Sequence, residues 1–130
     1  MKMILVDAVH TFVIEGQGIN KEMFDLLETF PNPKIILTGA NDEQYKVFGL
    51  DKMPYPVFTL KHNPEKTDPQ YYLTLLNQYN LKAEDVIYFE HDENAVKSAE
   101  SVGIKSYHYD SDKKDLVVLK SFIEYNVSTA

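Results

Sequence analysis

The chain opens with a short run of apolar residues that ends in an acid: residues 3–6 read Met-Ile-Leu-Val, and Asp7 follows. A continuous apolar run of this length predicts a strand that is buried on both faces, as in the centre of a parallel sheet. An acid directly after such a strand lies at the carboxyl edge of the sheet, where open α/β folds bind their ligands. The other apolar runs that predict strands are at residues 34–38, 56–60, 86–90 and 104–108.

Amphipathic patterns between these runs predict helices over residues 20–29, 41–48, 69–79, 93–102 and 113–125. Asn20 is a suitable N-cap, Pro69 suits a first helical turn, and Gly103 stands where a left-handed residue ends a helix. The polar, glycine-containing stretch 9–19 predicts a loop or small hairpin beside Asp7. Strand–helix alternation predicts an α/β fold, a Rossmann-like three-layer sandwich with a five-stranded parallel sheet.

Composition narrows the class of protein. A length of 130 residues predicts one domain over 1–130 that buries a real core. The absence of cysteine excludes disulfides and thiolate metal sites. A formal net charge of −7 argues against nucleic acid or an anionic membrane as partner. An early charge at the start and the lack of a span of transmembrane length predict a cytoplasmic protein.

All 13 basic residues are lysine. Without arginine there is no bidentate guanidinium clamp for a phosphate group. Any phosphate recognition must therefore use lysine, hydroxyl groups and backbone N–H groups.

Four segments in one order resemble the haloacid dehalogenase-like (HAD) superfamily of phosphohydrolases, most closely its pyrimidine-nucleotidase-like branch. The family's Asp-x-Asp-Gly-Thr is Asp-Ala-Val-His-Thr at residues 7–11, and its apolar strand ending in Thr or Ser is Ile-Ile-Leu-Thr at 35–38. Its Lys-Pro-Asp-Pro is Lys-Thr-Asp-Pro at 66–69. Its Phe-Asp-Asp-Ser is Phe-Glu-His-Asp at 89–92, and the likeness covers nearly the whole chain.

The resemblance implies a phosphoryl-transfer site. Asp7 would be the nucleophile that forms an aspartyl-phosphate, which divides one difficult displacement into two easier ones. A Mg²⁺ ion would offset the repulsion between anions. The residues implied as phosphate holders are Thr38, Gly39 and Lys66, and those implied as metal ligands are Asp7, Val9 through its carbonyl, Glu90, His91 and Asp92.

Three departures from the family pattern mark the motifs as degenerate. Val9 stands where the phosphatases keep a second Asp, and valine cannot move a proton. His91 stands where the family has its principal Mg²⁺ carboxylate, and imidazole is softer than Mg²⁺ prefers. The intervals between motifs leave no room for a cap domain. An uncovered site suits a phosphorylated small molecule or macromolecule, or a neighbouring subunit in a homo-oligomer acting as lid.

Each motif also has a simpler interpretation. Thr38 is a possible cap of the next helix, Lys61 competes with Lys66 for the site, and residues 90–93 are a possible acidic loop capping a helix. His62 shows no ligand spacing, so a structural role is expected. If Asp7, Glu90 and Asp92 converge, their repulsion is expected to raise the pKa of at least one of them.

Two other classes of α/β protein have to be compared with a Mg²⁺-dependent hydrolase. A receiver domain also uses acids, a Thr and a Lys on a five-stranded sheet, but its acceptor Asp follows the third strand. Here the third strand ends Phe-Thr-Leu-Lys at residues 58–61, which argues against a receiver. A catalytically silent binding or scaffold domain on the HAD fold is the second alternative to a Mg²⁺-dependent hydrolase.

Overall fold

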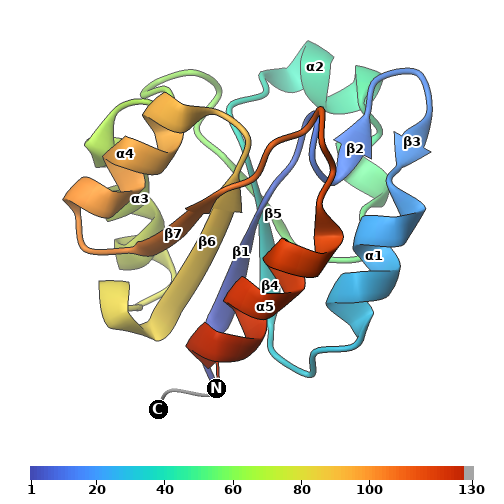
Figure 1. Ribbon diagram of the computed structural model, residues 1–130. Helices are drawn as coiled ribbons and strands as arrows, with labels where there is room; N and C mark the ends of the chain where they lie inside the picture. Colours follow the sequence, from blue (N-terminus) through green and yellow to red (C-terminus); the bar gives the residue numbers. More distant parts are fainter. Residues whose placement is uncertain (128–130) are drawn as a thin grey trace.

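A computed structural model of the protein describes residues 1–127 and contains a five-stranded sheet in which every neighbouring pair is parallel (Figure 1). Across the sheet the strands are β5 (Val57–Thr59), β4 (Lys34–Thr38), β1 (Met3–Asp7), β6 (Val86–Glu90) and β7 (Lys105–His108). The predicted fold class is confirmed, and β1 lies at the centre, between β4 and β6.

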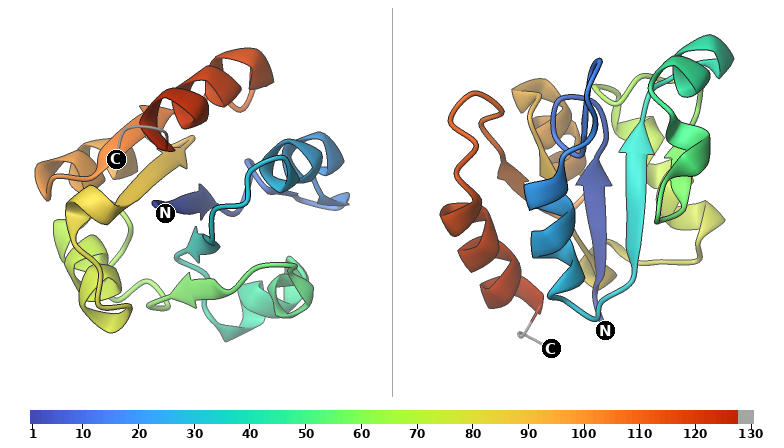
Figure 2. Two further views of the ribbon diagram at one scale, coloured as in Figure 1. Left: turned by 90° about the horizontal axis from the view of Figure 1, so that it is seen from below. Right: turned by 90° about the vertical axis from the view of Figure 1, so that its right-hand side faces the viewer.

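Helices cover both faces of the sheet and make three layers (Figures 1 and 2). On one face are α1 (Lys21–Glu28) and α5 (Leu116–Val127). On the other are α3 (Pro69–Gln78) and α4 (Glu93–Ser101). The remaining elements are α2 (Asp42–Val47), the short 3₁₀ helices η1 (Leu50–Lys52) and η2 (Ala83–Asp85), and the hairpin of β2 (Val13–Ile14) and β3 (Gly18–Ile19).

The apolar run of β1 divides its side chains between two cores. Ile4 and Val6 pack with residues of α1 and α5, whereas Leu5 packs against α3 on the other face. Successive side chains of a strand point to opposite faces, so a central strand must be apolar at every position. All three side chains are fully buried. This two-sided burial explains why the sequence shows a continuous run here instead of an alternating pattern.

The order of the strands distinguishes this fold from a receiver domain. In chain order the strands of the large sheet run 3-2-1-4-5, whereas flavodoxin-like receivers run 2-1-3-4-5. The chain therefore leaves β1 in one direction, returns, and adds β6 on the other side. The carboxyl ends of β1 and β6 flank this switch point, where open α/β sheets bind ligands.

Local signals in the sequence mark the beginnings and ends of several helices, as predicted. Asn20 accepts a hydrogen bond from the Met23 backbone N–H, and Pro69 begins α3 in its first turn. Gly103 follows α4 with φ +91°, a conformation that costs glycine little. The stretch 9–19 contains the small hairpin. None of the helices within residues 1–127 is long and apolar enough to cross a membrane.

Truncating the centre of the sheet is expected to be costly. Leu5→Ala removes a fully buried side chain from β1, and such truncations cost roughly 2–5 kcal/mol because a cavity remains. Denaturant unfolding followed by circular dichroism measures the change. Val117→Ala is the control, since its side chain is 77% exposed and a change within about 0.5 kcal/mol is expected. Equal effects of the two substitutions would contradict the assignment of β1 as the buried centre.

Candidate active site

The register of the sheet brings the chemically active residues together. Val6 of β1 pairs with Phe89 of β6, so the next residues, Asp7 and Glu90, end adjacent strands at the same level. On the other side Asp7 pairs with Leu37, one residue before Thr38. Three of the four sequence motifs therefore meet at one edge of the sheet because parallel strands end there together.

Asp7 is a buried carboxylate with donors on both oxygens. Its side chain is 1% exposed. Oδ1 accepts from Lys66 Nζ at 2.7 Å. Oδ2 accepts from the Thr11 hydroxyl at 2.7 Å and from the His91 backbone N–H at 3.1 Å, and it also contacts His91 Nδ1. These donors replace the water that burial removes.

Lys66 bridges the two buried acids. Its Nζ lies 2.7 Å from Asp7 Oδ1 and 2.6 Å from Glu90 Oε1. The loop that holds it is fixed from two sides, since Ser98 of α4 donates to the Thr67 carbonyl and Asp68 caps α3. Lys61 lies elsewhere, in an exposed ion pair with Asp42 at 3.0 Å. The structure thus places Lys66, and not Lys61, at the site.

Glu90 and His91 complete the cluster. Glu90 is fully buried; its Oε1 accepts from the Tyr88 hydroxyl and its Oε2 from the Asp92 backbone N–H at 3.1 Å. His91 Nδ1 contacts Asp7 Oδ2 and lies 3.2 Å from Glu90 Oε2. One imidazole nitrogen therefore faces both acids.

The electrostatics of the cluster differ from the expected repulsion between acids. Burial by itself would raise the pKa of the Asp7 carboxyl, but the Lys66 charge and the His91 hydrogen bond outweigh it and lower the pKa. Hydrogen bonds to Asp7 and Glu90 raise the pKa of His91 to about 10, and burial opposes this. The expectation of a raised carboxyl pKa was wrong for Asp7, because two cations lie beside it.

Thr38 ends β4 and does not cap the next helix. Asn41 caps α2 through the Gln44 backbone N–H at 2.9 Å, so the simpler interpretation of Thr38 was wrong. The Thr38 hydroxyl oxygen accepts from the Ala40 backbone N–H at 3.1 Å. The Thr38 carbonyl accepts from the Tyr71 hydroxyl of α3 at 2.7 Å. This buried hydrogen bond fixes the end of β4 against the helix that follows Lys66.

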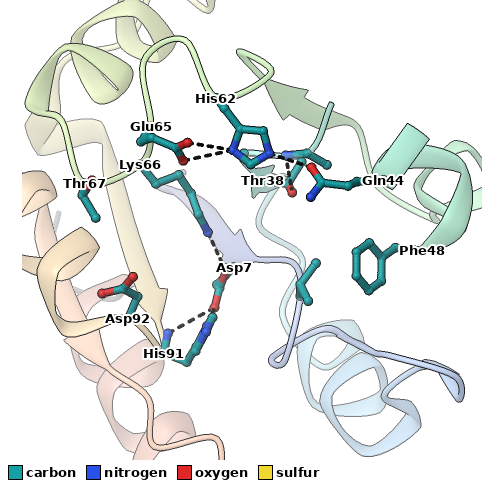
Figure 3. Close-up of a pocket in the computed structure, with 13 residues that line it drawn as sticks. Asp7, Thr38, Gln44, Phe48, His62, Glu65, Lys66, Thr67, His91 and Asp92 are labelled. Carbon is teal, nitrogen blue, oxygen red and sulfur yellow. Dashed lines mark hydrogen bonds and ion pairs between the residues drawn. The ribbon is translucent and has the colours of Figure 1, made fainter. Parts of the chain in front are cut away.

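A pocket of about 290 Å³ opens over this edge (Figure 3). The sequence-predicted residues that line it are Asp7, Val9, Thr38, Gly39, Lys66, His91 and Asp92. Glu90 is not among the lining residues, because it lies beneath Lys66 and His91 with no exposed surface. The Asp92 side chain caps α4 through the Asn94 backbone N–H at 2.9 Å. The acidic loop thus serves two roles, with Glu90 and His91 on Asp7 and Asp92 on the helix.

The far wall of the pocket was not anticipated from the sequence. His62 Nδ1 lies 2.9 Å from Glu65 Oε1, and its Nε2 lies 2.6 Å from Gln44 Oε1 (Figure 3). The ring packs over Gly39, where an added Cβ would stand 3.3 Å from Nδ1. Gly39 therefore admits the imidazole. The backbone of His62 is left-handed at φ +65°, and no periodic pattern in the sequence predicts such a conformation.

Three side chains of the described residues offer ligand atoms to a metal ion at one point. Atoms of Asp7, Glu90 and His91 lie within 4.8 Å of one another. Two are carboxylate oxygens and one is an imidazole nitrogen. This donor set fits a divalent cation.

No family model and no curated protein matches this chain. Solved structures do match it. A HAD family enzyme from Bacteroides thetaiotaomicron, in its magnesium complex, superposes with a TM-score of 0.72 at 11% identity over 92% of this chain and 98% of that one. Its complex with magnesium and inorganic phosphate gives a TM-score of 0.66 at 12% identity, over 83% of this chain and 93% of that one.

A HAD-superfamily hydrolase from Ehrlichia chaffeensis is similar in fold as well. It has a TM-score of 0.65 at 19% identity, and the match covers 85% of this chain and 60% of that one. These likenesses show that the chain has the fold of HAD-superfamily hydrolases.

Removing the central cation should destabilise the protein strongly. Lys66→Met leaves the Asp7 and Glu90 carboxylates buried without their shared ammonium, and breaking a buried pair costs about 3–5 kcal/mol. Urea unfolding measures the loss. Lys61→Met is the matched control, since its ion pair joins side chains that are 60% and 82% exposed and is worth about 1 kcal/mol or less. A Lys66→Met protein as stable as the control would contradict the bridging role.

Proposed function

We propose that this protein is a HAD-like phosphohydrolase in which Asp7 attacks the phosphorus of a phosphate ester. The observation that supports this most is the Asp7 carboxylate itself. It is buried at the switch point of the sheet and lines the pocket. Lys66 and His91 hold its pKa below the ordinary value, so the carboxylate is ionised and ready to act as a nucleophile.

The reaction would have two steps at this carboxylate. An Asp7 oxygen forms a bond to phosphorus, the ester P–O bond breaks, and the alcohol leaves with its electron pair and takes a proton from solvent. Water then attacks the aspartyl-phosphate, releases inorganic phosphate and restores the carboxylate. When bound, a divalent cation would neutralise charge between Asp7 and the phosphoryl oxygens, as Mg²⁺ is expected to do in this family.

Because the chain has no arginine, we propose that a lysine, a hydroxyl group and a backbone N–H hold the phosphate. Lys66 Nζ is placed to bind a phosphoryl oxygen beside Asp7. The Thr38 oxygen already accepts from Ala40, so its hydrogen is oriented toward another acceptor, such as a phosphoryl oxygen. Gly39 lines the pocket beside Thr38, so its backbone N–H is proposed as a further donor to the phosphate. These groups stabilise the charge that develops during transfer.

The substrate we propose is a phosphorylated small molecule or macromolecule with a good leaving group. Val9 lines the pocket where relatives keep the proton donor, and general acid help is typically worth about 10²–10⁴ in rate. The Val9 carbonyl is proposed as a further metal ligand. Within residues 1–127 no separate domain covers the pocket, and its open rim suits a large substrate or a second subunit as lid. The branch that we propose for the chain is the pyrimidine-nucleotidase-like one.

A silent binding domain is the second candidate, and one observation favours it. Both oxygens of Asp7 and both oxygens of Glu90 already have protein partners. Two carboxylates face two cations, Lys66 and His91, so the cluster is electrically balanced without a ligand. A balanced, fully bonded cluster is also what a scaffold that has lost its chemistry would retain.

Ester hydrolysis separates the two candidates. We expect slow turnover of p-nitrophenyl phosphate, whose leaving group needs little protonation, and almost none of unactivated alkyl phosphates. Asp7→Asn should abolish turnover. Val9→Asp should increase it, most for alkyl esters and by up to about 10²-fold.

The assay compares all three proteins with both ester types in the presence of divalent cations. Val9→Asn is the matched control, because it adds polarity of similar size but no acid. If wild type and Asp7→Asn are equally inactive and Val9→Asp gains nothing, the silent-domain interpretation holds.

A further inference from the structure

We propose that Asp7, Glu90 and His91 form a mixed nitrogen–oxygen metal site in which His91 Nδ1 is a direct ligand, and that this site selects ions of the Mn²⁺ and Co²⁺ class over Mg²⁺. The inference deepens the proposed function, on which it rests, by naming the metal class of the same site. It concerns this chain's own departure from the family pattern, which is the imidazole at position 91.

The geometry of the three donors is the first argument. Their ligand atoms lie within 4.8 Å of one another, on side chains that are 1%, 0% and 27% exposed for Asp7, Glu90 and His91. Nδ1 faces Oδ2 of Asp7 and lies 3.2 Å from Oε2 of Glu90. Asp7, Glu90 and His91 would hold an ion here through two carboxylate oxygens and Nδ1, and Nδ1 would release its proton to solvent when the ion binds.

The imidazole is held in place from several directions. The His91 backbone N–H donates to Asp7 Oδ2 at 3.1 Å, and His108 Nε2 lies 2.9 Å from the His91 carbonyl oxygen. The ring also meets the edge of His10, with ring centroids 5.3 Å apart. Fixed ligands lose little freedom on binding an ion, which favours a real site over a chance contact.

The chemistry of the donors sets the selectivity. Mg²⁺ requires hard oxygen ligands in near-octahedral order, and replacing one carboxylate by imidazole removes both a hard donor and a negative charge. Imidazole suits transition-metal ions such as Zn²⁺ better, and the affinity of a given nitrogen–oxygen site rises along the first-row metals from Mn²⁺, which also accepts oxygen ligands, to Co²⁺. Histidine at position 91 therefore weakens the binding of Mg²⁺ more than the binding of transition-metal ions.

The test measures metal binding directly, with no substrate present. Metal-free protein is titrated with Mg²⁺, Mn²⁺ and Co²⁺ by calorimetry, and melting temperature is followed at each metal concentration. We expect Mn²⁺ and Co²⁺ to bind at least about tenfold more tightly than Mg²⁺. Pulsed electron paramagnetic resonance of the Mn²⁺ complex should show coupling to an imidazole nitrogen.

Two variants make the assignment specific. His91→Asp should lose the nitrogen coupling, bind Mg²⁺ more tightly than wild type, and reduce the preference for Mn²⁺ by about tenfold or more. His62→Asn is the control, because it removes an imidazole on the far wall of the pocket, where it contacts Glu65 and Gln44, and keeps a residue type that tolerates the positive φ of 65° at that position. It should leave both the coupling and the metal preference unchanged.

Each outcome decides one question. Absence of metal binding, equal affinity for Mg²⁺ and Mn²⁺, or nitrogen coupling that survives in His91→Asp overturns the inference. Circular dichroism of each variant shows that a lost response is not lost folding. Metal binding as expected without Asp7-dependent ester turnover supports this site and removes the hydrolase proposal. If the protein binds no metal and still hydrolyses the ester through Asp7 in the presence of a chelator, the hydrolase proposal stands and the metal site is overturned.

Discussion

The Lys66 ammonium between two buried carboxylates is the interaction on which the ligand-binding edge of this protein depends. Asp7 and Glu90 end adjacent central strands and have almost no exposed surface. Two such acids without a cation would repel each other in a medium of low polarity and would have to take up protons. With Lys66 within 2.7 Å of both, the ammonium lies between the two acids and offsets their repulsion at the switch point of the sheet. The cost of desolvation is offset only because every carboxylate oxygen also has a donor.

Topology explains why so few residues build the site. Parallel strands end at one edge of the sheet. The chain adds β4 and β5 on one side of β1 and then β6 and β7 on the other, so the ends of β1 and β6 lie beside an open crevice. The helix after Lys66 then returns to this edge, where the Tyr71 hydroxyl bonds the Thr38 carbonyl. The same apolar residues that form the two cores thus set the positions of Asp7, Thr38 and Lys66.

The sequence predicted the fold better than the site, for physical reasons. Strands and helices leave periodic patterns, and caps such as Asn20 and Gly103 have local causes, so both could be read from neighbouring residues. The meeting of Asp7 with Lys66 was implied by the resemblance to the HAD superfamily, because Lys66 lies in the loop before α3 and not at the end of a strand. The pKa of Asp7 did not, because it depends on which cations fill the space between acids. The wall formed by His62 depends on left-handed loop residues and on the space above Gly39, which no sequence pattern reveals.

His91 and Val9, two of the three departures from the HAD-family pattern, both line the pocket. A third carboxylate at position 91 would replace the imidazole and leave Lys66 beside three acids, and a tightly held cation would be needed to offset the added negative charge. Imidazole removes that charge and can either share a proton with Asp7 or donate its nitrogen to a metal ion. The same ring therefore fits the closed ion cluster of this structure and also the metal site that we propose. Val9 brings no acid to the pocket, and Lys66 and His91 are charged groups that contact Asp7 there, so a change in the state of His91 changes how tightly the Asp7 carboxylate is held.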